Sequence, residues 1–109
     1  MPMATTPEPP YVAVIFTSIR MPGDDGYAAM AAEMDALGGR QPGFLGIESA
    51  RDADGLGITI SYWATHEDAR AWKAVAEHRV AQRMGKERWY RAYRARIATV
   101  EREYGFERT

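Results

Sequence analysis

The chain of 109 residues contains no cysteine, only two histidines and no long apolar segment. The absence of cysteine excludes disulfides, thiolate nucleophiles and thiolate metal ligands, and it is typical of proteins that work in the cytoplasm. A membrane-spanning helix needs about 20 consecutive apolar residues, and no run in the chain approaches that length. The first ten residues also lack the basic and apolar regions of a secretory signal peptide. We therefore expect a cytoplasmic protein with no membrane partner.

The two histidines are too far apart in the chain to bind one metal ion. His66 and His78 are twelve residues apart in one predicted helix, which separates them by roughly 18 Å at about 1.5 Å of rise per residue. His66 and Glu67 resemble the start of a zinc-protease motif, but Arg70 stands where that motif requires its second histidine. The chain contains neither a G-x-S-x-G motif nor a glycine-rich nucleotide fingerprint. The sequence therefore predicts no metal site and no cofactor.

The net charge is only −1, but the charges are unevenly distributed. Residues 1–65 hold three Lys or Arg and eight Asp or Glu, whereas residues 66–109 hold eleven and seven. One interpretation is a set of solvated Arg and Glu side chains on helices and complementary surfaces. The other is a positive rim that attracts an anionic small molecule. The arginines alternate with glutamates and no nucleic-acid-binding motif is present, so we expect no nucleic-acid partner.

A tail and six regular elements account for the pattern of apolar, proline and glycine residues. Residues 1–10 contain four prolines and are predicted to form a disordered tail, which leaves residues 11–109 as a single domain. Alternating, β-branched and aromatic residues predict four strands, and apolar residues at helical spacing predict two helices. The strands are expected at residues 11–20, 44–51, 56–63 and 90–104, and the helices at about residues 25–38 and 66–85.

Both predicted helices have recognisable N-terminal signals. Asp24 or Asp25 is available to cap the first helix, whose stripe of Tyr27, Met30, Met34 and Leu37 is expected to face a core. Thr65 is the predicted cap of the second helix. Acidic residues follow Thr65 in the first turn, where the helix dipole favours negative charge.

The order β-α-β-β-α-β predicts an α+β, ferredoxin-like fold with a four-stranded antiparallel sheet. Two helices cover only one face of such a sheet. The strand at residues 11–20 is nevertheless apolar on both faces, with Val14 and Phe16 on one and Ile15 and Ile19 on the other. A second copy of the chain is the simplest cover for the remaining face, because two-fold homodimers are the commonest assembly. We therefore expect a homodimer that is formed through the sheet faces.

Residues 62–93 contain all three tryptophans and both histidines, and we expect any chemistry of the protein to use this stretch. Trp72 lies on the apolar stripe of the second helix. There it either packs on the sheet as a core residue or lines a cleft between the helices and the sheet. His78 falls on a different side of the helix unless the helix bends. It is either an exposed group or the base that an enzyme would use near neutral pH.

The other aromatic residues also allow two interpretations. Trp63, Trp89, Tyr90 and Tyr93 are either core or interface residues, or they join Phe16 in an aromatic wall that binds a planar ligand.

Two stretches, RQPGFLGIESARDADGLGITISYW and SYWATHEDARAWKAVAEHRVAQRMGKERWYRAYRARIATVEREYG, resemble the antibiotic biosynthesis monooxygenase-like family. The likeness is greatest to its small bacterial members of unassigned role and covers roughly residues 11–105. Single elements such as Q-P-G-F and Y-W are short, but their joint order and spacing is a specific signal. The resemblance implies a dimeric α/β barrel, in which two ferredoxin-like chains pair through their sheets.

The resemblance also implies a cofactor-independent monooxygenase that acts on a small aromatic or quinol-like compound. In such enzymes the ligand is deprotonated beside a tryptophan of the second helix and passes an electron to O₂. Trp72 matches that tryptophan, and with His78 it is the expected catalytic pair. An asparagine precedes the family tryptophan by four residues, where this chain has Asp68. A tyrosine follows it by about six, where this chain has His78.

Phe16, Trp63, Asp68, Trp89 and Tyr93 are the expected contacts of the aromatic ligand.

Two alternatives to the monooxygenase remain open. One is a non-catalytic dimer that binds a small hydrophobic molecule. The other is a haem-binding or haem-degrading protein, because related dimers carry a strand-one asparagine, the helix tryptophan and a ligating histidine about ten residues later. Here the corresponding positions are Phe16 or Thr17, Trp72 and Gln82, so His78 would have to bind the iron. A cleft beside Trp72 that contains a titratable group would favour the enzyme.

Overall fold

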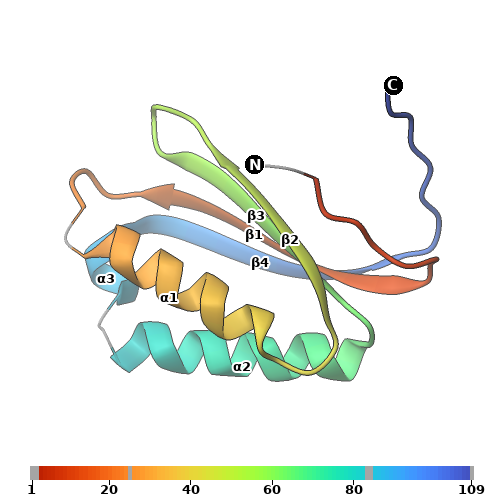
Figure 1. The fold of residues 1–109 in the computed structure, drawn as a ribbon. Helices are drawn as coiled ribbons and strands as arrows, with labels where there is room; N and C mark the ends of the chain where they lie inside the picture. Colours follow the sequence, from red (N-terminus) through yellow and green to blue (C-terminus); the bar gives the residue numbers. More distant parts are fainter. Residues whose placement is uncertain (1–2, 25, 83–84, 109) are drawn as a thin grey trace.

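The computed structural model describes residues 3–24, 26–82 and 85–108, and it contains a four-stranded antiparallel sheet with its helices on one face (Figure 1). The strand order is β2-β3-β1-β4. The elements are β1 (Tyr11–Arg20), α1 (Tyr27–Gly39), β2 (Phe44–Arg51), β3 (Leu56–Trp63), α2 (His66–Gln82), α3 (Gly85–Trp89) and β4 (Tyr90–Val100). This arrangement confirms the predicted ferredoxin-like fold.

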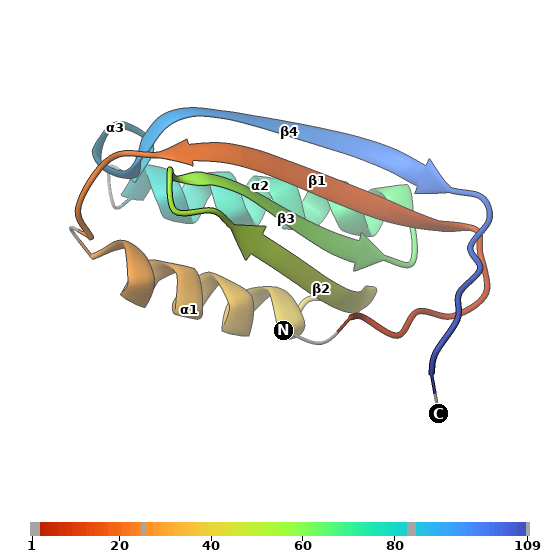
Figure 2. The same cartoon turned by 90° about the horizontal axis from the view of Figure 1, so that it is seen from above.

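When the molecule is seen from above, α2 lies beneath β1 and β3, whereas α1 lies alongside the β2 edge of the sheet (Figure 2). Both terminal segments lie on the opposite side of the sheet from the helices (Figure 1). No described helix has the length and the apolar sequence that crossing a membrane requires.

The strand boundaries of β1, β2 and β3 agree with the prediction, but the predicted end of β4 at residue 104 is wrong. Strand β4 ends at Val100, which pairs with Tyr11 at the beginning of β1. Among the described residues, no strand pairs with the chain beyond Val100, and Tyr104 is 94% exposed. Alternation in the sequence continues past the point where the partner strand ends, and for that reason the pattern predicted a longer strand.

The predicted cap of α2 is confirmed, whereas the N-cap position of α1 is Gly26, which has no side chain to cap it, and Asp24 bonds to the start of the helix from two residues further out. The Asp24 carboxylate accepts hydrogen bonds from the backbone N–H groups of Gly26 and Ala28 at 3.0 and 3.2 Å. Thr65 Oγ1 accepts one from the N–H of Asp68 at 3.0 Å and so caps α2. Asp25 and residues 83–84, where the second helix was predicted to continue, lie outside the described residues.

The short helix α3 was not predicted, because the sequence suggested a direct passage from the second helix into β4. It ends at Trp89, which is only 2% exposed. The Trp89 carbonyl accepts hydrogen bonds from the Met21 N–H at 2.8 Å and from Arg20 Nε at 3.2 Å. Helix α3 therefore ties the start of β4 to the end of β1.

The segments before β1 and after β4 meet at one end of the sheet. The hydroxyls of Thr6 and Tyr11 donate hydrogen bonds to the Glu103 carboxylate at 3.0 and 2.9 Å. The Ala4 N–H donates to Glu48 of β2 at 3.0 Å. The disorder predicted for residues 1–10 stays a prediction, and residues 1–2 lie outside the described part of the chain.

The core centres on Trp63, whose side chain is fully buried. Its ring stacks on Trp72 with 5.8 Å between centroids and meets Phe44 edge-on at 5.5 Å. Its Nε1 donates a hydrogen bond to Ser61 Oγ at 2.9 Å, so the one polar atom of the side chain is satisfied. Val12, Val14 and Ala69 complete the buried cluster. This core joins α2 firmly to the middle of the sheet.

Candidate functional site

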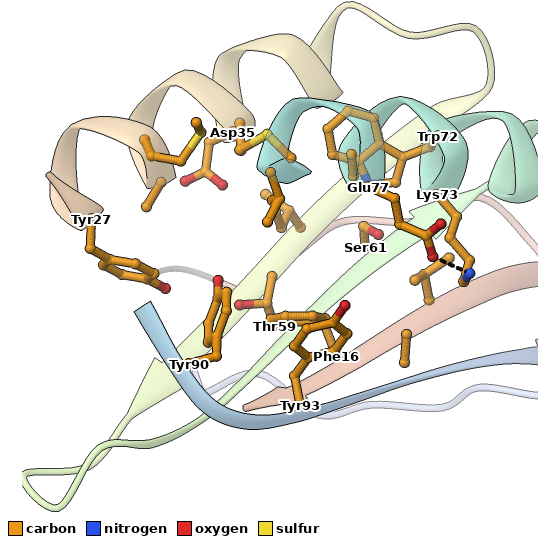
Figure 3. Close-up of a pocket in the computed structure, with 18 of the residues that line it drawn as sticks. Phe16, Tyr27, Asp35, Thr59, Ser61, Trp72, Lys73, Glu77, Tyr90 and Tyr93 are labelled. Atoms are coloured by element: carbon orange, nitrogen blue, oxygen red, sulfur yellow. Dashed lines mark hydrogen bonds and ion pairs between the residues drawn. The ribbon is translucent and has the colours of Figure 1, made fainter. Parts of the chain in front are cut away.

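A cavity of about 470 Å³ lies between α1, α2 and the helix-facing side of the sheet (Figure 3). This volume falls within the roughly 300–1,000 Å³ that is usual for small-molecule sites. The wall from α1 includes Met30 and Met34, and the wall from α2 includes Trp72 and Val80. The space between the two helices is therefore not filled by the side chains of the protein itself.

Trp72 forms one end of the cavity and is held from two sides. Its ring stacks on the buried Trp63 at an interplanar angle of 24°. On the other side it lies against Gly38 near the end of α1, where an added Cβ would be only 3.2 Å from the ring. Glycine at this position allows α1 to approach the ring closely. Trp72 is thus half-buried and fixed in orientation, and one edge of it faces the cavity.

The sheet side of the cavity is an aromatic cluster of Phe16 from β1 with Tyr90 and Tyr93 from the start of β4. Phe16 lies 5.6 Å from Tyr90 and 5.3 Å from Tyr93 between ring centroids. The two tyrosine rings meet at 5.6 Å in an edge-on arrangement. Rings at these distances and angles support one another and offer a planar ligand a preformed apolar surface.

The Tyr90 hydroxyl is a protonated hydrogen-bond donor at neutral pH. Burial raises its pKa most, and the charge interaction and hydrogen bond with Tyr27 of α1 raise it further. Tyr27 itself lies between two cations. The Arg20 guanidinium is stacked 3.4 Å from the centre of its ring, and Arg51 approaches its hydroxyl at 3.4 Å. In Figure 3 the Tyr27 and Tyr90 hydroxyls point toward one another.

Asp35 is the unpaired carboxylate of the cavity. It extends from α1 toward the interior of the site (Figure 3). The other lining carboxylate, Glu77, forms an ion pair with Lys73 one turn away on α2. Within the described part of the chain Asp35 has neither a hydrogen bond nor an ion pair. Asp35 is a solvent-exposed residue of the lining, and the desolvation that its surroundings impose on the carboxylate raises its pKa.

The structure brings three of the predicted site residues to the cavity, namely Trp72, Phe16 and Tyr93. Trp63 is entirely buried behind Trp72. Trp89 is buried behind Tyr27, with 6.1 Å between ring centroids.

Two predicted residues of α2 lie away from the cavity. His78 is exposed on α2, which is unbroken from His66 to Gln82, so no bend turns His78 toward Trp72. Asp68 is in the first turn of α2, and its carboxylate lies over Gly43, where an added Cβ would be 2.0 Å from it.

Asp35, Tyr27 and the two methionines of α1 were not predicted as site residues. Tyr27, Met30 and Met34 were expected to pack in a core, because a helical stripe does not distinguish a filled interior from an open one. The available signal for Asp35 is its place directly after Met34, at the edge of that stripe. A polar residue at such an edge is usually solvated, so its spacing alone carries little information.

Arg94 and Arg96 of β4 do not face the cavity. Tyr93 and Ala95 line the cavity, so Arg94 and Arg96, which alternate with them, lie on the opposite face of the sheet. Among the described residues that line the cavity, the one cation is Lys73, which is paired with Glu77. Arg20 and Arg51 are not lining residues but lie against Tyr27, which is one.

The lining residues do not suit a metal ion or haem. Among the described residues, no three His, Asp or Glu side chains are grouped so that they could hold a metal ion. The lining residues also include no histidine to bind haem iron.

A family model described as antibiotic biosynthesis monooxygenase matches residues 10–84, which is more than half of the chain. The chain belongs to this family. Among curated proteins, this chain is 46% identical over 105 residues to the Bacillus subtilis (strain 168) protein YqjZ, which is described as uncharacterised. The match covers 96% of this chain and 92% of YqjZ.

Solved structures with this fold include a variant of SnoaB from Streptomyces nogalater, described as a cofactor-independent oxygenase. It has a TM-score of 0.69 at 16% identity, and the match covers 85% of this chain and 95% of SnoaB. Protein SO0527 from Shewanella oneidensis has a TM-score of 0.68 at 9% identity, with 84% and 91% covered. At such low identity these likenesses establish the shared fold of the family.

Proposed function

We propose that this family member is a cofactor-independent monooxygenase that acts on a small phenolic or quinol-like aromatic compound. The observation that carries the proposal is the open cavity beside Trp72, which is lined by aromatic rings and contains an unpaired carboxylate. Membership of the family and the description of SnoaB as a cofactor-independent oxygenase support the same reaction class.

The proposed reaction needs a preformed apolar site and O₂. The ligand lies between Trp72 and the rings of Phe16 and Tyr93, and it loses its phenolic proton. The resulting anion is the electron donor to O₂. For 1-naphthol the balanced reaction consumes one O₂ and gives 1,4-naphthoquinone and one water, so one oxygen atom enters the product and the other leaves as water. The protein contributes orientation, exclusion of water and hydrogen bonds to the charge that develops.

Oxygen labelling tests this proposal directly. Purified protein is incubated with 1-naphthol under oxygen-18 gas, with an oxygen electrode and mass spectrometry of the extracted product. We expect O₂ uptake equal to the quinone formed, with one labelled atom in the quinone, and we expect this in the presence of a chelator.

A non-catalytic binding protein gives a different result. In that case 1-naphthol binds, as measured by titration calorimetry, but O₂ uptake does not exceed that of a sample without protein. Absence of both binding and turnover with 1-naphthol and with the corresponding hydroquinone contradicts the proposal as a whole.

We also propose that two copies of the chain pair through the sheet face opposite the helices. This face carries exposed apolar side chains, with Ile19 at 37%, Leu56 at 46% and Ile58 at 44% exposure. It also carries Arg94 and Arg96 of β4 at one side and, at the other, acidic Glu48 of β2. A two-fold partner is the occupant that would cover the apolar centre and bring opposite charges together.

The mass of the protein in solution tests this pairing. By light scattering after size exclusion we expect twice the 12.2 kDa of one chain. Ile58→Lys introduces a charge in the apolar centre and should shift the mass toward that of a single chain. Ala74→Lys, at an exposed position of α2 outside the cavity, is the matched control and should leave the mass unchanged. A wild-type protein that elutes as one chain would contradict the proposal.

A further inference from the structure

We propose that Asp35 is the group in the cavity that accepts the proton of a phenolic ligand. This inference rests on the proposed function, because it assigns the base that a cofactor-independent oxygenation of a phenol requires. The transfer breaks the O–H bond of the ligand, leaves its electron pair on the phenolate oxygen and forms an O–H bond on a carboxylate oxygen of Asp35.

The position of Asp35 is the first argument. It lies on the last two turns of α1, and its carboxylate points from the helix into the space above Phe16 and Thr59 (Figure 3). Trp72 closes the same space at its other side. A planar ligand that stacks on these rings can therefore present its hydroxyl to Asp35 without any movement of the helices.

The second argument is that the other charged groups of the cavity are already engaged. Lys73 and Glu77 face the cavity from α2 and neutralise one another. Arg79 of α2 and Glu33 of α1, which are not lining residues, pair with one another at 2.7 Å. Asp35 lacks a comparable partner in the described part of the chain, so its lone pairs remain available to a ligand.

The third argument concerns proton affinity. Desolvation raises the pKa of Asp35, although the residue as a whole is solvent-exposed, so its carboxylate is a stronger base than that of an ordinary aspartate. Tyr90 cannot replace it, because Tyr90 holds its proton through burial and through its hydrogen bond with Tyr27. Their hydroxyls are suited to donate hydrogen bonds to a second oxygen of the ligand.

The test uses 4-nitrophenol, a phenol that ionises near neutral pH and whose anion is yellow. When 4-nitrophenol is bound beside the Asp35 carboxylate, the phenol and the carboxyl group together hold a single proton. The carboxylate then disfavours the phenolate. We expect bound 4-nitrophenol to ionise at a pH at least about one unit above that of the free compound. In the Asp35→Asn variant this upward shift should disappear while binding persists.

Two further variants separate a ligand contact from a structural role. Asp54→Asn makes the same chemical change in an exposed turn and should behave as the wild type. Asp35→Glu restores a carboxylate and should recover part of the shift. In turnover of 1-naphthol, Asp35→Asn should lower kcat at least about 100-fold, which is the usual contribution of a general base.

The outcomes are distinguishable. If 4-nitrophenol binds but ionises at the same pH in the wild type and in Asp35→Asn, then Asp35 does not contact the hydroxyl. The inference is then wrong, although the cavity still binds phenols. If neither 4-nitrophenol nor 1-naphthol binds to the wild type, the proposed function fails together with it.

Discussion

Replacing Trp72 with alanine should weaken the binding of 1-naphthol about 10-fold and lower its turnover at least about 100-fold. The ring is the wall against which the ligand stacks, and the loss of one aromatic contact of about 1–1.5 kcal/mol corresponds to about a tenfold change in affinity. Turnover should fall further than affinity, because misplacement of a ligand by about 1 Å can reduce a rate about 100-fold. Titration calorimetry and O₂ uptake measure the two effects.

Trp72→Phe is the matched control for this experiment. Phenylalanine keeps an aromatic face toward the cavity and toward Trp63, so binding should remain within a few-fold of the wild type. Because Trp72 also packs on Trp63, thermal unfolding must show that the alanine variant is folded at the assay temperature. A folded Trp72→Ala variant with unchanged affinity and kcat would remove Trp72 from the site and leave it a packing residue only.

Replacing Trp63 with alanine should cost about 3–5 kcal/mol of unfolding free energy. Trp63 is fully buried at the centre of the core, where it contacts Trp72 and Phe44. Truncation leaves a cavity that the strands cannot close, and it leaves the Ser61 hydroxyl without its tryptophan partner. For a domain whose total stability is about 5–15 kcal/mol, this loss is a large fraction of the whole. Urea unfolding at a fixed protein concentration measures it.

The comparison variant for Trp63 is Tyr104→Ala. Tyr104 is 94% exposed and lies beyond the end of β4, so its removal should leave the free energy of unfolding unchanged within about 0.5 kcal/mol. A loss below about 1 kcal/mol for Trp63→Ala would mean that the core around it rearranges freely. In that case Trp72 would not be held in a fixed orientation either.

Strong local patterns explain which parts of the fold could be predicted from the sequence. Each of β1, β2 and β3 is a short segment with β-branched or aromatic residues that begins directly after a proline or a glycine, namely Pro10, Gly43 and Gly55. The hydrogen bonds of Asp24 and Thr65 to the helix starts are likewise local, since each side chain and the amide it binds are two to four residues apart. The prediction of an element boundary was wrong where that boundary depends on a strand distant in the sequence, as the end of β4 depends on its pairing with β1.

The candidate site could be predicted only in part, for the same reason. Trp72, Phe16 and Tyr93 were expected from aromatic character, and they meet at the cavity. Trp63 and Trp89 have the same character but are buried behind it. Residue type and spacing do not distinguish an aromatic ring that faces an open space from one that fills it, because that difference depends on how far α1 and α2 stand apart.

By itself, the sequence determined the order of the four strands and the two long helices, the absence of thiol chemistry and the membership of the family, because these depend on residue type and local order. Only the tertiary structure decided which residues share the cavity. The register of β4 against β1 turned Tyr93 toward the cavity and Arg94 away from it. The packing of α1 over the sheet then brought Asp35 toward the same space. These outcomes depend on contacts between residues that are distant in the chain, and no local pattern specifies such contacts.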